Sequence, residues 1–382
     1  MELYIHIPFC RKKCRYCSFT SYVGKEAYFE TYVNHLLKEA VFRIREAEEP
    51  VTTVYIGGGT PSLLPAVLFR KLVCGLKKIY SFDSLDEFSA EANPGTVSHD
   101  WISAAADLGL NRLSFGMQAS QNHILSALGR IHGMTDVTES VQLARDAGID
   151  NINLDLIFGI PGQSESDWSD TLNDALSLCP HHISAYGLIP EEGTPLFQDL
   201  QANRVHLPEP EVERKMYDTA VHFLNSHGFH RYEISNFAQD GYECIHNIGY
   251  WTQVPYIGLG VSAASMTRIQ HSVHGMTYRR RTNPDSLDEY FQLIDHNKAM
   301  MPFELISQDA SRFETIMLGL RMLRGISEEE FYKKHGLSLD KLYGVKLRKM
   351  EEAGLMYRDG NRWKMTERGL DIQNSVLVEL MD

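Results

Sequence analysis

The sequence lacks long apolar runs, has few cysteines and carries a deficit of positive charge. No apolar stretch approaches the roughly 18 residues that a membrane-spanning helix needs, so no segment is expected to cross a bilayer. Lys and Arg number 37 against 50 Asp and Glu, a net charge of −13, which disfavours general binding to nucleic acid or anionic membrane. The first residues include neither a basic region nor a long apolar stretch, so no secretory signal is predicted and a cytoplasmic location is expected.

What the chain does have is enough apolar material for packed cores. Hydrophobic residues make up 43% of its 382 positions, and this length predicts two or three domains of roughly 100–200 residues each. Three of the six cysteines, Cys10, Cys14 and Cys17, lie close together, whereas Cys74, Cys179 and Cys244 are scattered. Because cytoplasmic thiols stay reduced, this pattern predicts a metal site and not a disulfide framework.

The first half of the sequence alternates β-rich runs with amphipathic helical patterns. Helices are predicted over 26–46 and from 63 to 79. Strands are predicted over Leu3–Ile7, Thr52–Ile56, 86–91, 112–117, 151–158 and 182–188. Six such units are too few for a closed barrel of eight, so an α/β fold with an open (βα)6 partial barrel is preferred over a flat doubly wound sheet. Ligands are then expected at the C-terminal ends of the strands.

The pattern changes after about residue 200. A helix is predicted over 209–226, followed by an α+β extension at 229–285 that is mostly strand and loop. Helices near 309–323, 327–334 and 338–353 precede a hairpin at Asp359-Gly360, an order typical of a winged helix. The predicted domains are therefore 1–205, 206–300 and 301–382. The last has nearly equal numbers of basic and acidic residues, which favours a lid or docking module over a DNA-binding domain.

The spacing Cys10-x-x-x-Cys14-x-x-Cys17 places three thiolates in one loop directly after the first strand. A structural zinc ion normally takes four protein ligands, and no second pair of ligands follows at zinc-finger spacing. Three thiolates suit a [4Fe–4S] cluster in which one iron remains open for a small chelating ligand. The alternative is a zinc loop completed by His6 or by a distant residue.

With these cysteines, the sequence resembles the radical S-adenosylmethionine (SAM) superfamily. The resemblance implies that SAM chelates the open iron and that an electron from the cluster cleaves SAM to a radical. A second matching motif, Gly57-Gly58-Gly59-Thr60-Pro61, closes the second strand, where the superfamily binds the amino group of SAM. Tyr16 stands where the family often has an aromatic residue near the adenine, although plain loop packing explains it equally well.

Further residues resemble the SAM-contacting set of the oxygen-independent coproporphyrinogen oxidase group. They fall at or near the ends of successive predicted strands, and Arg and Asp suit a carboxylate and ribose hydroxyls, respectively. Taken singly, each of them would be an ordinary surface or capping residue. The full set of cofactor-binding residues implied by the resemblance is Tyr4, Tyr16, Gly58, Gly59, Thr60, Glu91, Gln118, Arg130 and Asp155, with Cys10, Cys14 and Cys17 as metal ligands.

Within this group the sequence resembles the HemW-type heme chaperones more than the oxidase. The oxidase has a further cysteine two residues after the third, where this chain has Phe19, and a long extension where this chain has nine residues before Cys10. The segment His246-Asn247-Ile-Gly-Tyr250-Trp251 is similar to the HNxxYW signature of the chaperones. The resemblance implies that His246 ligates heme iron and that the aromatic residues pack on the porphyrin; without it, a structural loop would be preferred.

The function implied is transfer of heme to acceptor proteins by a protein that also holds a SAM-liganded cluster, and no residue is assigned a catalytic role. The alternatives are a radical SAM oxidative decarboxylase of coproporphyrinogen III and a radical SAM enzyme that acts on heme. A flavodoxin or ferredoxin is the expected type of electron donor. Three further features allow both a functional and a purely structural interpretation. Cys244 is a second heme ligand, a covalent attachment point for heme or an inert thiol. His271 and His274 are heme neighbours or polar loop residues, and Arg279-Arg280-Arg281 meets heme propionates, an acceptor protein or only solvent.

Overall fold

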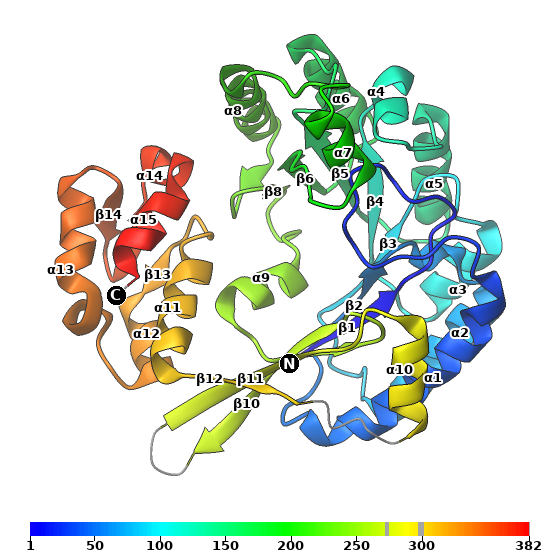
Figure 1. Ribbon diagram of the computed structural model, residues 1–382, viewed down its shortest axis with the longest axis horizontal. Helices are drawn as coiled ribbons and strands as arrows, with labels where there is room; N and C mark the ends of the chain where they lie inside the picture. The colour runs from blue at the N-terminus through cyan, green and yellow to red at the C-terminus, as the bar shows by residue number, and fades with distance from the viewer. Residues whose placement is uncertain (272–274, 297–301, 382) are drawn as a thin grey trace.

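The computed structural model describes residues 1–271, 275–296 and 302–381. Its centre is a curved run of parallel strands in the order of the chain (Figure 1). These strands are β1 (Glu2–Ile7), β2 (Thr53–Gly58), β3 (Glu87–Ala92), β4 (Arg112–Gln118), β5 (Asn151–Phe158) and β6 (His182–Gly187). The predicted open (βα)6 partial barrel is confirmed, and each strand begins within a residue or two of its predicted position.

Helices cover the outer face of the barrel because their apolar residues recur at helical spacing. In α1 this places Tyr32, Val33, Leu36 and Ala40 in the core. The predicted helix 26–46 is α1 with a short 3-10 turn at each end, Glu26–Tyr28 and Ile44–Glu46. The helices of this layer are α1 (Phe29–Arg43), α2 (Ala66–Ile79), α3 (His99–Asp107), α5 (Met134–Asp146), α6 (Glu165–Ser177) and α8 (Pro210–Ser226). Two short helices, α4 (Asn122–Ala127) and α7 (Pro195–Gln201), instead pack in a separate apolar cluster beside the loop after β1.

An extension lengthens the sheet at both ends. Next to β6 lie β8 (Asn236–Ala238) and β7 (His230–Arg231), both antiparallel to their neighbours. On the other side, β9 (Tyr256–Leu259) runs parallel to β1 and is followed across the sheet by three further strands. These are β10 (Ala264–His271), β11 (Gly275–Thr282) and β12 (Glu304–Ile306), and the helix α10 (Leu287–Asp295) packs nearby on α1. Among the described strands β7 and β12 form the two edges, so the sheet stays open.

The expectation of strand and loop over 229–285 is wrong for one segment. Residues Ile245–Thr252 form the helix α9, although they include glycine, asparagine and aromatic residues that are poor helix formers. The carboxylate of Glu87 accepts hydrogen bonds from the backbone N–H of Ile245 (2.7 Å) and from the Cys244 thiol (3.3 Å). A negative charge at this end stabilises the helix. The cap comes from β3, far away in the sequence, so local propensity did not predict the helix.

The glycine inside α9 has a packing reason. A Cβ atom added at Gly249 would lie 1.7 Å from Oε1 of Glu2, at the start of β1. The backbone of α9 therefore rests directly on the first residues of β1, and Glu87 ties it to the start of β3. This helix closes the end of the barrel opposite to the C-terminal ends of the strands.

The C-terminal segment forms a unit with its own core, seen on the left of Figure 1. Its elements are α11 (Gln308–Gly319), β13 (Ile326–Ser327), α12 (Glu328–His335), α13 (Leu339–Glu352), β14 (Met356–Asp359), β15 (Arg362–Met365), α14 (Glu367–Asp371) and α15 (Gln373–Leu380). Helices α11, α12 and α13 and a small sheet in the order β13-β15-β14 match the predicted winged-helix-like arrangement, and α14 and α15 follow as additions that were not predicted. Across the described part of the chain, every helix is too short or too polar to span a bilayer.

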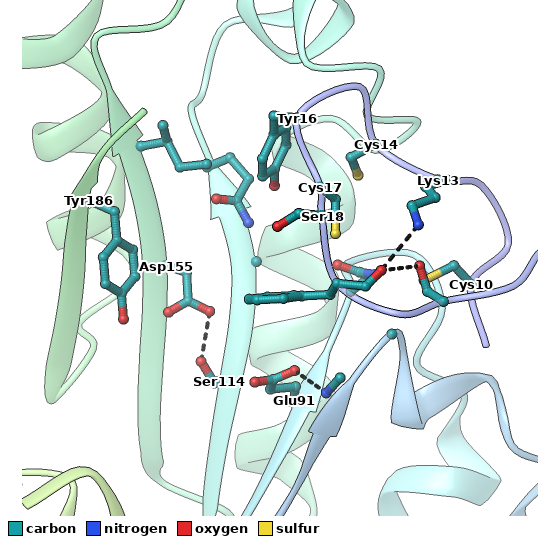
Figure 2. A pocket seen from close by; sticks show the side chains of 18 of the residues that line it. Cys10, Lys13, Cys14, Tyr16, Cys17, Ser18, Glu91, Ser114, Asp155 and Tyr186 are labelled. Carbon is teal, nitrogen blue, oxygen red and sulfur yellow. Dashed lines mark hydrogen bonds between the residues drawn. The ribbon is translucent and has the colours of Figure 1, made fainter. Parts of the chain in front are cut away.

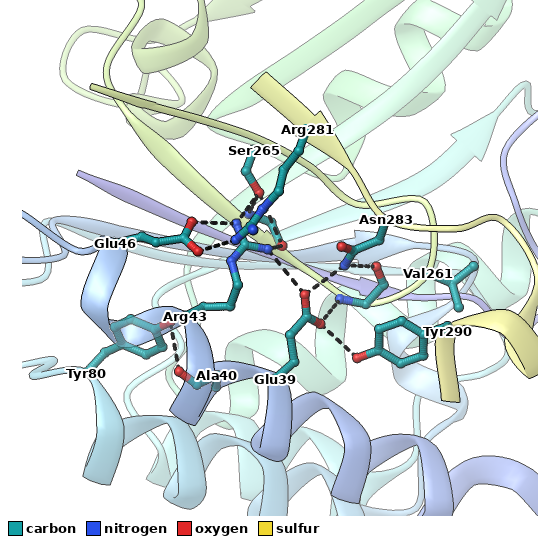
Figure 3. A network of polar contacts seen from close by, with 12 residues as sticks. Glu39, Ala40, Arg43, Glu46, Tyr80, Val261, Ser265, Arg281, Asn283 and Tyr290 are labelled. Carbon is teal, nitrogen blue, oxygen red and sulfur yellow. Dashed lines mark hydrogen bonds and ion pairs between the residues drawn. The ribbon is translucent and has the colours of Figure 1, made fainter. Parts of the chain in front are cut away.

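A buried ion pair fastens the extension to the barrel (Figure 3). Glu39 and Arg43 of α1 are 1% and 2% exposed, and their closest charged atoms lie 3.3 Å apart. Arg43 donates to the carbonyl of Gly258 (3.2 Å) and to the hydroxyl of Ser265 (2.7 Å). Glu39 accepts hydrogen bonds from the backbone N–H of Gly260, from Asn283 and from Tyr290. Because each charge is surrounded by partners, this pair is expected to tolerate the loss of either member poorly.

Replacing Glu39 by leucine should therefore lower the free energy of unfolding by about 3–5 kcal/mol. Arg43 and Arg281 are then left with Glu46 as their shared carboxylate, and Gly260, Asn283 and Tyr290 lose their buried acceptor. Denaturant unfolding followed by circular dichroism measures this value. The matched control is Glu30→Leu. Glu30 also belongs to α1 but forms an exposed ion pair with Lys71 of α2, so its loss should change the free energy of unfolding by less than about 1 kcal/mol. Equal losses in the two variants would contradict the special role of the buried pair.

Candidate functional site

A cavity of about 530 Å³ opens at the C-terminal ends of the barrel strands and reaches down to α9 (Figure 2). It collects nearly all of the residues that the sequence analysis selected. Those that line it are Tyr4, Cys10, Cys14, Tyr16, Cys17, Gly58, Gly59, Glu91, Gln118, Arg130, Asp155 and His246. The loop after β1 forms one side, and Asp155 and Tyr186 stand opposite on β5 and β6.

The three cysteines of the loop after β1 are free thiols. Burial raises the pKa of Cys10 and of Cys17, so a cation is needed to hold these thiols as thiolates. Two donors already point at sulfur atoms of the loop: the Thr60 hydroxyl at Cys10 (3.6 Å) and the Arg130 guanidinium at Cys14 (3.4 Å). Hydrogen bonds to sulfur are characteristic of iron–sulfur sites, and three such thiols on one loop fit a [4Fe–4S] cluster.

The alternative of a zinc loop completed by His6 finds no support in the position of that residue. Nε2 of His6 donates to the carbonyl of Thr20 (2.8 Å), and Nδ1 accepts from the hydroxyl of Tyr4 (3.0 Å). Both ring nitrogens are therefore engaged. Nowhere in the described ranges do three or more His, Cys, Asp or Glu side chains converge as they would around a single metal ion.

The glycines after β2 allow the close approach of the cluster loop. Gly58 has a φ of +111°, and a Cβ atom there would lie 2.4 Å from the ring of His6. At Gly59 a Cβ atom would lie 2.7 Å from the carbonyl oxygen of Phe9, next to the first cysteine. The chain can therefore bring the end of β2 and the loop after β1 together only with glycine at these two positions.

Glu91 stands at the end of β3, next to the glycine turn. One carboxylate oxygen accepts from the backbone N–H of Gly58 (2.9 Å) and the other from the hydroxyl of Tyr55 (3.0 Å). Burial, with a smaller effect of Asp155, raises the pKa of this carboxyl group to about 7. Glu91 therefore changes charge near neutral pH, and a cationic group bound beside it would favour the carboxylate.

The end of β4 is distorted at the cavity. The strand register shifts between Phe115 and Gln118, and Gln118 has a φ of +68°, which is strained for a residue other than glycine. Gly116 makes room for Arg130, because a Cβ atom there would lie 2.4 Å from its guanidinium. Arg130 donates to the carbonyl of Gly116 and leaves a buried Nε without a partner. This arrangement aims a cation beside the cysteine loop.

Asp155 settles which face of β5 lines the barrel interior, a question that the alternating pattern left open. Its carboxylate accepts from the Ser114 hydroxyl (2.8 Å) and from the Asn153 side chain (2.8 Å), as Figure 2 shows for Ser114. Two neutral donors fix the orientation of the carboxylate while it lines the cavity. A fixed acceptor of this kind can take hydroxyl groups of a sugar.

Thr60 alone among the selected residues does not line this cavity. It lies behind the cluster loop, is 1% exposed, and connects Asn93 (2.7 Å) to the sulfur of Cys10. Its position suits support of the cysteine loop and not direct contact with a ligand in the cavity. Tyr4 and Tyr16 do line the cavity. Tyr4 stacks on Tyr55 with ring centroids 6.3 Å apart.

His246 lies on α9, at the floor of the cavity, and is 1% exposed. Its Nδ1 is hydrogen-bonded to Thr53 (2.7 Å) and its Nε2 to Tyr250 (3.0 Å). Burial lowers the pKa of this imidazole to about 3, so it is neutral over the physiological range. A neutral imidazole is the form that ligates metals, but one of these hydrogen bonds must be exchanged first.

Several lining residues were missed by the sequence analysis. Tyr55 and Ser114 lie on β2 and β4 with their side chains toward the cavity, as do Asn93 after β3 and Tyr186 on β6. Side chains along a strand alternate between its two faces. This alternation along β2 and β4 was the signal that could have placed Tyr55 and Ser114 on the face toward the cavity. Gly116 carried no signal, because its partner Arg130 comes from another element.

The structure treats the three lesser candidate features of the sequence differently. Cys244 is fully buried against Glu87, and burial raises the pKa of its thiol, which favours the inert reading. The arginine triplet is not one patch: Arg279 donates to Thr267, Arg280 pairs with Glu314, and Arg281 pairs with Glu46. His274 and the side chain of His271 lie outside the described residues.

Comparisons with known proteins agree with this arrangement. The model of the radical SAM superfamily matches residues 4–175, and that of the HemN C-terminal domain matches residues 306–372. A heme chaperone HemW of Bacillus subtilis is 36% identical over 98% of this chain and 97% of its own length. The heme chaperone HemW of Escherichia coli is 33% identical over 99% of this chain and 97% of its length. Coproporphyrinogen III oxidase (HemN) of Escherichia coli shares the fold, with a TM-score of 0.84 at 22% identity over 100% of this chain and 89% of that one.

The titration of Glu91 gives a test of the cavity with SAM, the ligand that the radical SAM match implies. The raised pKa means that the carboxyl group is neutral below about 7 and charged above it. Affinity for the cationic ligand should therefore increase several-fold, up to about tenfold, as the pH rises from about 6 to about 7.5. Isothermal titration calorimetry of the reconstituted protein measures this dependence. Glu91→Gln keeps the size of the side chain, so the pH dependence of its SAM affinity should reflect only the titration of SAM itself. If the variant and the unaltered protein had the same pH dependence, Glu91 would be excluded from the SAM site.

Proposed function

Because the chain belongs to the HemW family of radical SAM proteins, we propose that it is a heme chaperone, which binds heme and a SAM-liganded [4Fe–4S] cluster and delivers the heme to acceptor proteins. The observation that carries this proposal is the position of α9. Its residues His246, Asn247 and Tyr250 line the same cavity as the three cysteines, at the opposite end. A single hollow thus offers thiols at one end and an imidazole with aromatic neighbours at the other.

At the upper end, Cys10, Cys14 and Cys17 would hold the cluster, with Thr60 and Arg130 donating to the sulfur atoms. When bound, the cluster and SAM supply one-electron chemistry that no side chain provides. Around them, Glu91 and the backbone of Gly58 would receive the amino group, and Arg130 the carboxylate of SAM. Asp155 would accept the ribose hydroxyls, with Gln118, Tyr16 and Tyr4 forming the walls of this end.

At the lower end, His246 would supply an axial nitrogen to heme iron. Nε2 is the nitrogen available, because its partner Tyr250 lines the cavity whereas Thr53, the partner of Nδ1, is completely buried. The Tyr250 hydroxyl then competes with iron for the same nitrogen. Such competition weakens the bond to iron by about the free energy of one hydrogen bond, roughly 0.5–1.5 kcal/mol. Weakened ligation suits a protein that must release its heme.

The partners and the location follow from the same proposal. Heme-acceptor proteins are required by the transfer, and a flavodoxin or ferredoxin is the type of electron donor that would serve the cluster. The free thiols of the cysteine loop suit a reducing compartment such as the cytoplasm.

The enzymatic alternative is oxidative decarboxylation of coproporphyrinogen III. It draws on the fold shared with HemN, but Phe19 lines the cavity where the resemblance places a further cysteine in the oxidase. Purified, anaerobically reconstituted protein should therefore form no protoporphyrinogen from coproporphyrinogen and SAM above the rate of a Cys14→Ala control. SAM-dependent product measured by fluorescence after oxidation would replace the chaperone proposal by the oxidase.

Two variants of α9 test the heme site in opposite directions. His246→Gln should lower heme affinity by at least about tenfold, because the amide retains a partner for Thr53 but is a poor iron ligand. Tyr250→Phe should raise heme affinity by up to about tenfold, because it removes the competitor for Nε2. Soret titration gives both affinities, and the absorbance of the cluster near 400 nm should stay unchanged.

The matched control for this pair is His182→Gln. His182 is likewise fully buried, and its two nitrogens are bonded to Asn153 and Tyr232, but it does not line the cavity. It should leave heme affinity unchanged. Unchanged heme binding in His246→Gln would exclude this residue as the ligand, and absence of heme binding in the unaltered protein would refute the chaperone function.

A further inference from the structure

A second hollow of about 710 Å³ adjoins the cavity described above. Its wall includes Tyr256, Met266 and Arg280, which lie side by side across three strands. Met266 on β10 is the register partner of Tyr256 on β9 and of Arg280 on β11. Because side chains at paired positions share one face of a sheet, these three form a continuous row. We call this hollow the aromatic cleft.

The other walls of the aromatic cleft combine large apolar side chains with the polar side chains of His6, Ser18, Thr20, Glu91 and Ser262. Trp251 and Tyr250 come from α9, Leu318 comes from α11 of the C-terminal unit, and Phe19 comes from the cluster loop. Phe19 is 63% exposed, which is unusual for so large an apolar side chain. Aromatic and thioether side chains on facing walls are the surroundings that a flat, apolar ring system prefers.

Arg280 is the arginine in the lining of the aromatic cleft, and Glu91 is the acidic residue there. The Nη2 of Arg280 donates to Glu314 (3.0 Å), whose side chain is 18% exposed while that of Arg280 is 37% exposed. A guanidinium has five N–H donors in a planar fork, so it can bind a second carboxylate beside Glu314. Its neighbours in sequence are turned away: Arg279 bonds to Thr267 and lies over the ring of Phe303, and Arg281 pairs with Glu46.

The two hollows share part of their wall, because Tyr4, Ser18, Phe19, Gly58, Glu91 and Tyr250 line both. Of these residues, Tyr250 belongs to α9. This residue holds Nε2 of His246, so movement of the Tyr250 ring would connect that nitrogen to the aromatic cleft. A ring system in the cleft would leave the region of Arg130, Asp155 and Gln118 free, because none of these three lines the cleft. Glu91, Gly58 and Tyr4 line both hollows, so a porphyrin in the cleft would lie against the amino-group end of SAM and not against its ribose.

Resting on the proposed heme function, we infer that the macrocycle lies in the aromatic cleft and that Arg280 binds a propionate group of the porphyrin. Arg280 would act as the residue that selects porphyrins with a free carboxylate at this edge. The chemistry is charge-assisted and bidentate, between a planar guanidinium and a carboxylate.

The test compares iron protoporphyrin with its dimethyl ester, which has the same ring but no carboxylate charge. The unaltered protein should bind the dicarboxylate about tenfold more tightly than the ester. In Arg280→Gln this preference should vanish, through loss of affinity for the dicarboxylate with unchanged affinity for the ester. Arg280→Lys should retain part of the preference, because the charge remains without the planar fork. Affinities come from Soret titration, with SAM binding as a check that each variant is folded.

Two further variants separate the possible outcomes. Arg279→Gln is the matched control and should keep the full preference, because its side chain does not line the cleft. Leu318→Trp narrows the cleft and should weaken binding of both porphyrins while SAM binding is retained. Equal preference in Arg280→Gln and in the unaltered protein, or unchanged porphyrin binding in Leu318→Trp, would overturn this inference. If His246→Gln still weakens heme binding in that case, the proposed function stands; if the unaltered protein binds neither porphyrin, both fail.

Discussion

The contact between Glu39 and Arg43 determines where the extension sits on the barrel. Both charges belong to α1, yet most of their hydrogen bonds go to β9 and the residue after it, to β10, to the segment before α10 and to α10 itself. Because α9 ends only a few residues before β9, its position depends on this buried pair as well. The helix α1, on the outside of the barrel, therefore holds β9 in place and, through β9, the floor helix α9 that precedes it.

The floor of the barrel combines many polar side chains with little charge. Burial raises the pKa of Glu2 to about 9 and lowers that of His246 to about 3, so both are uncharged at neutral pH. Desolvation selects these forms, because an isolated charge in such surroundings is costly. Hydrogen bonds then fix the side chains: His246 to Thr53 and Tyr250, and Glu87 to the N-terminus of α9. The charges that remain at the floor, on Glu87 and on the buried Arg112, are opposite in sign and interact with each other.

The sequence predicted the barrel well because its strands and helices carry local signals. Each strand has a β-rich run ended by glycine, proline or a polar residue, and the cysteine and glycine motifs fall at strand ends. The helix α9 was missed because Glu87, a residue distant in sequence, caps it. The glycine within it, Gly249, is required by contact with Glu2, which is also distant in sequence. Thr60 was expected among the SAM contacts because it belongs to the motif, but only the fold shows that it supports Cys10.

The arginine triplet shows a different limit. A run of three cations suggests one patch, whereas the pleat of β11 sends Arg280 to the face opposite Arg279 and Arg281. The alternation of side chains would have separated Arg280 from its neighbours if the sequence had shown that 275–282 form a regular strand, but the sequence did not show this. Neither the cleft beside Arg280 nor its wall from α11 could be predicted, since they bring together segments from both ends of the chain.

The open sheet has a mechanical consequence for a protein that must give up a wide cargo. A closed barrel releases a ligand only through its mouth, past the loops that bind it. Here the described sheet ends at β7 and β12, and the remaining walls of the aromatic cleft include side chains of α9, α11 and the loop after β1. A flat ligand held between the sheet and these side chains could therefore leave by displacing side chains, without breaking any hydrogen bond between strands. Its dissociation rate would be set by rotation of a few side chains, which an approaching acceptor can accelerate.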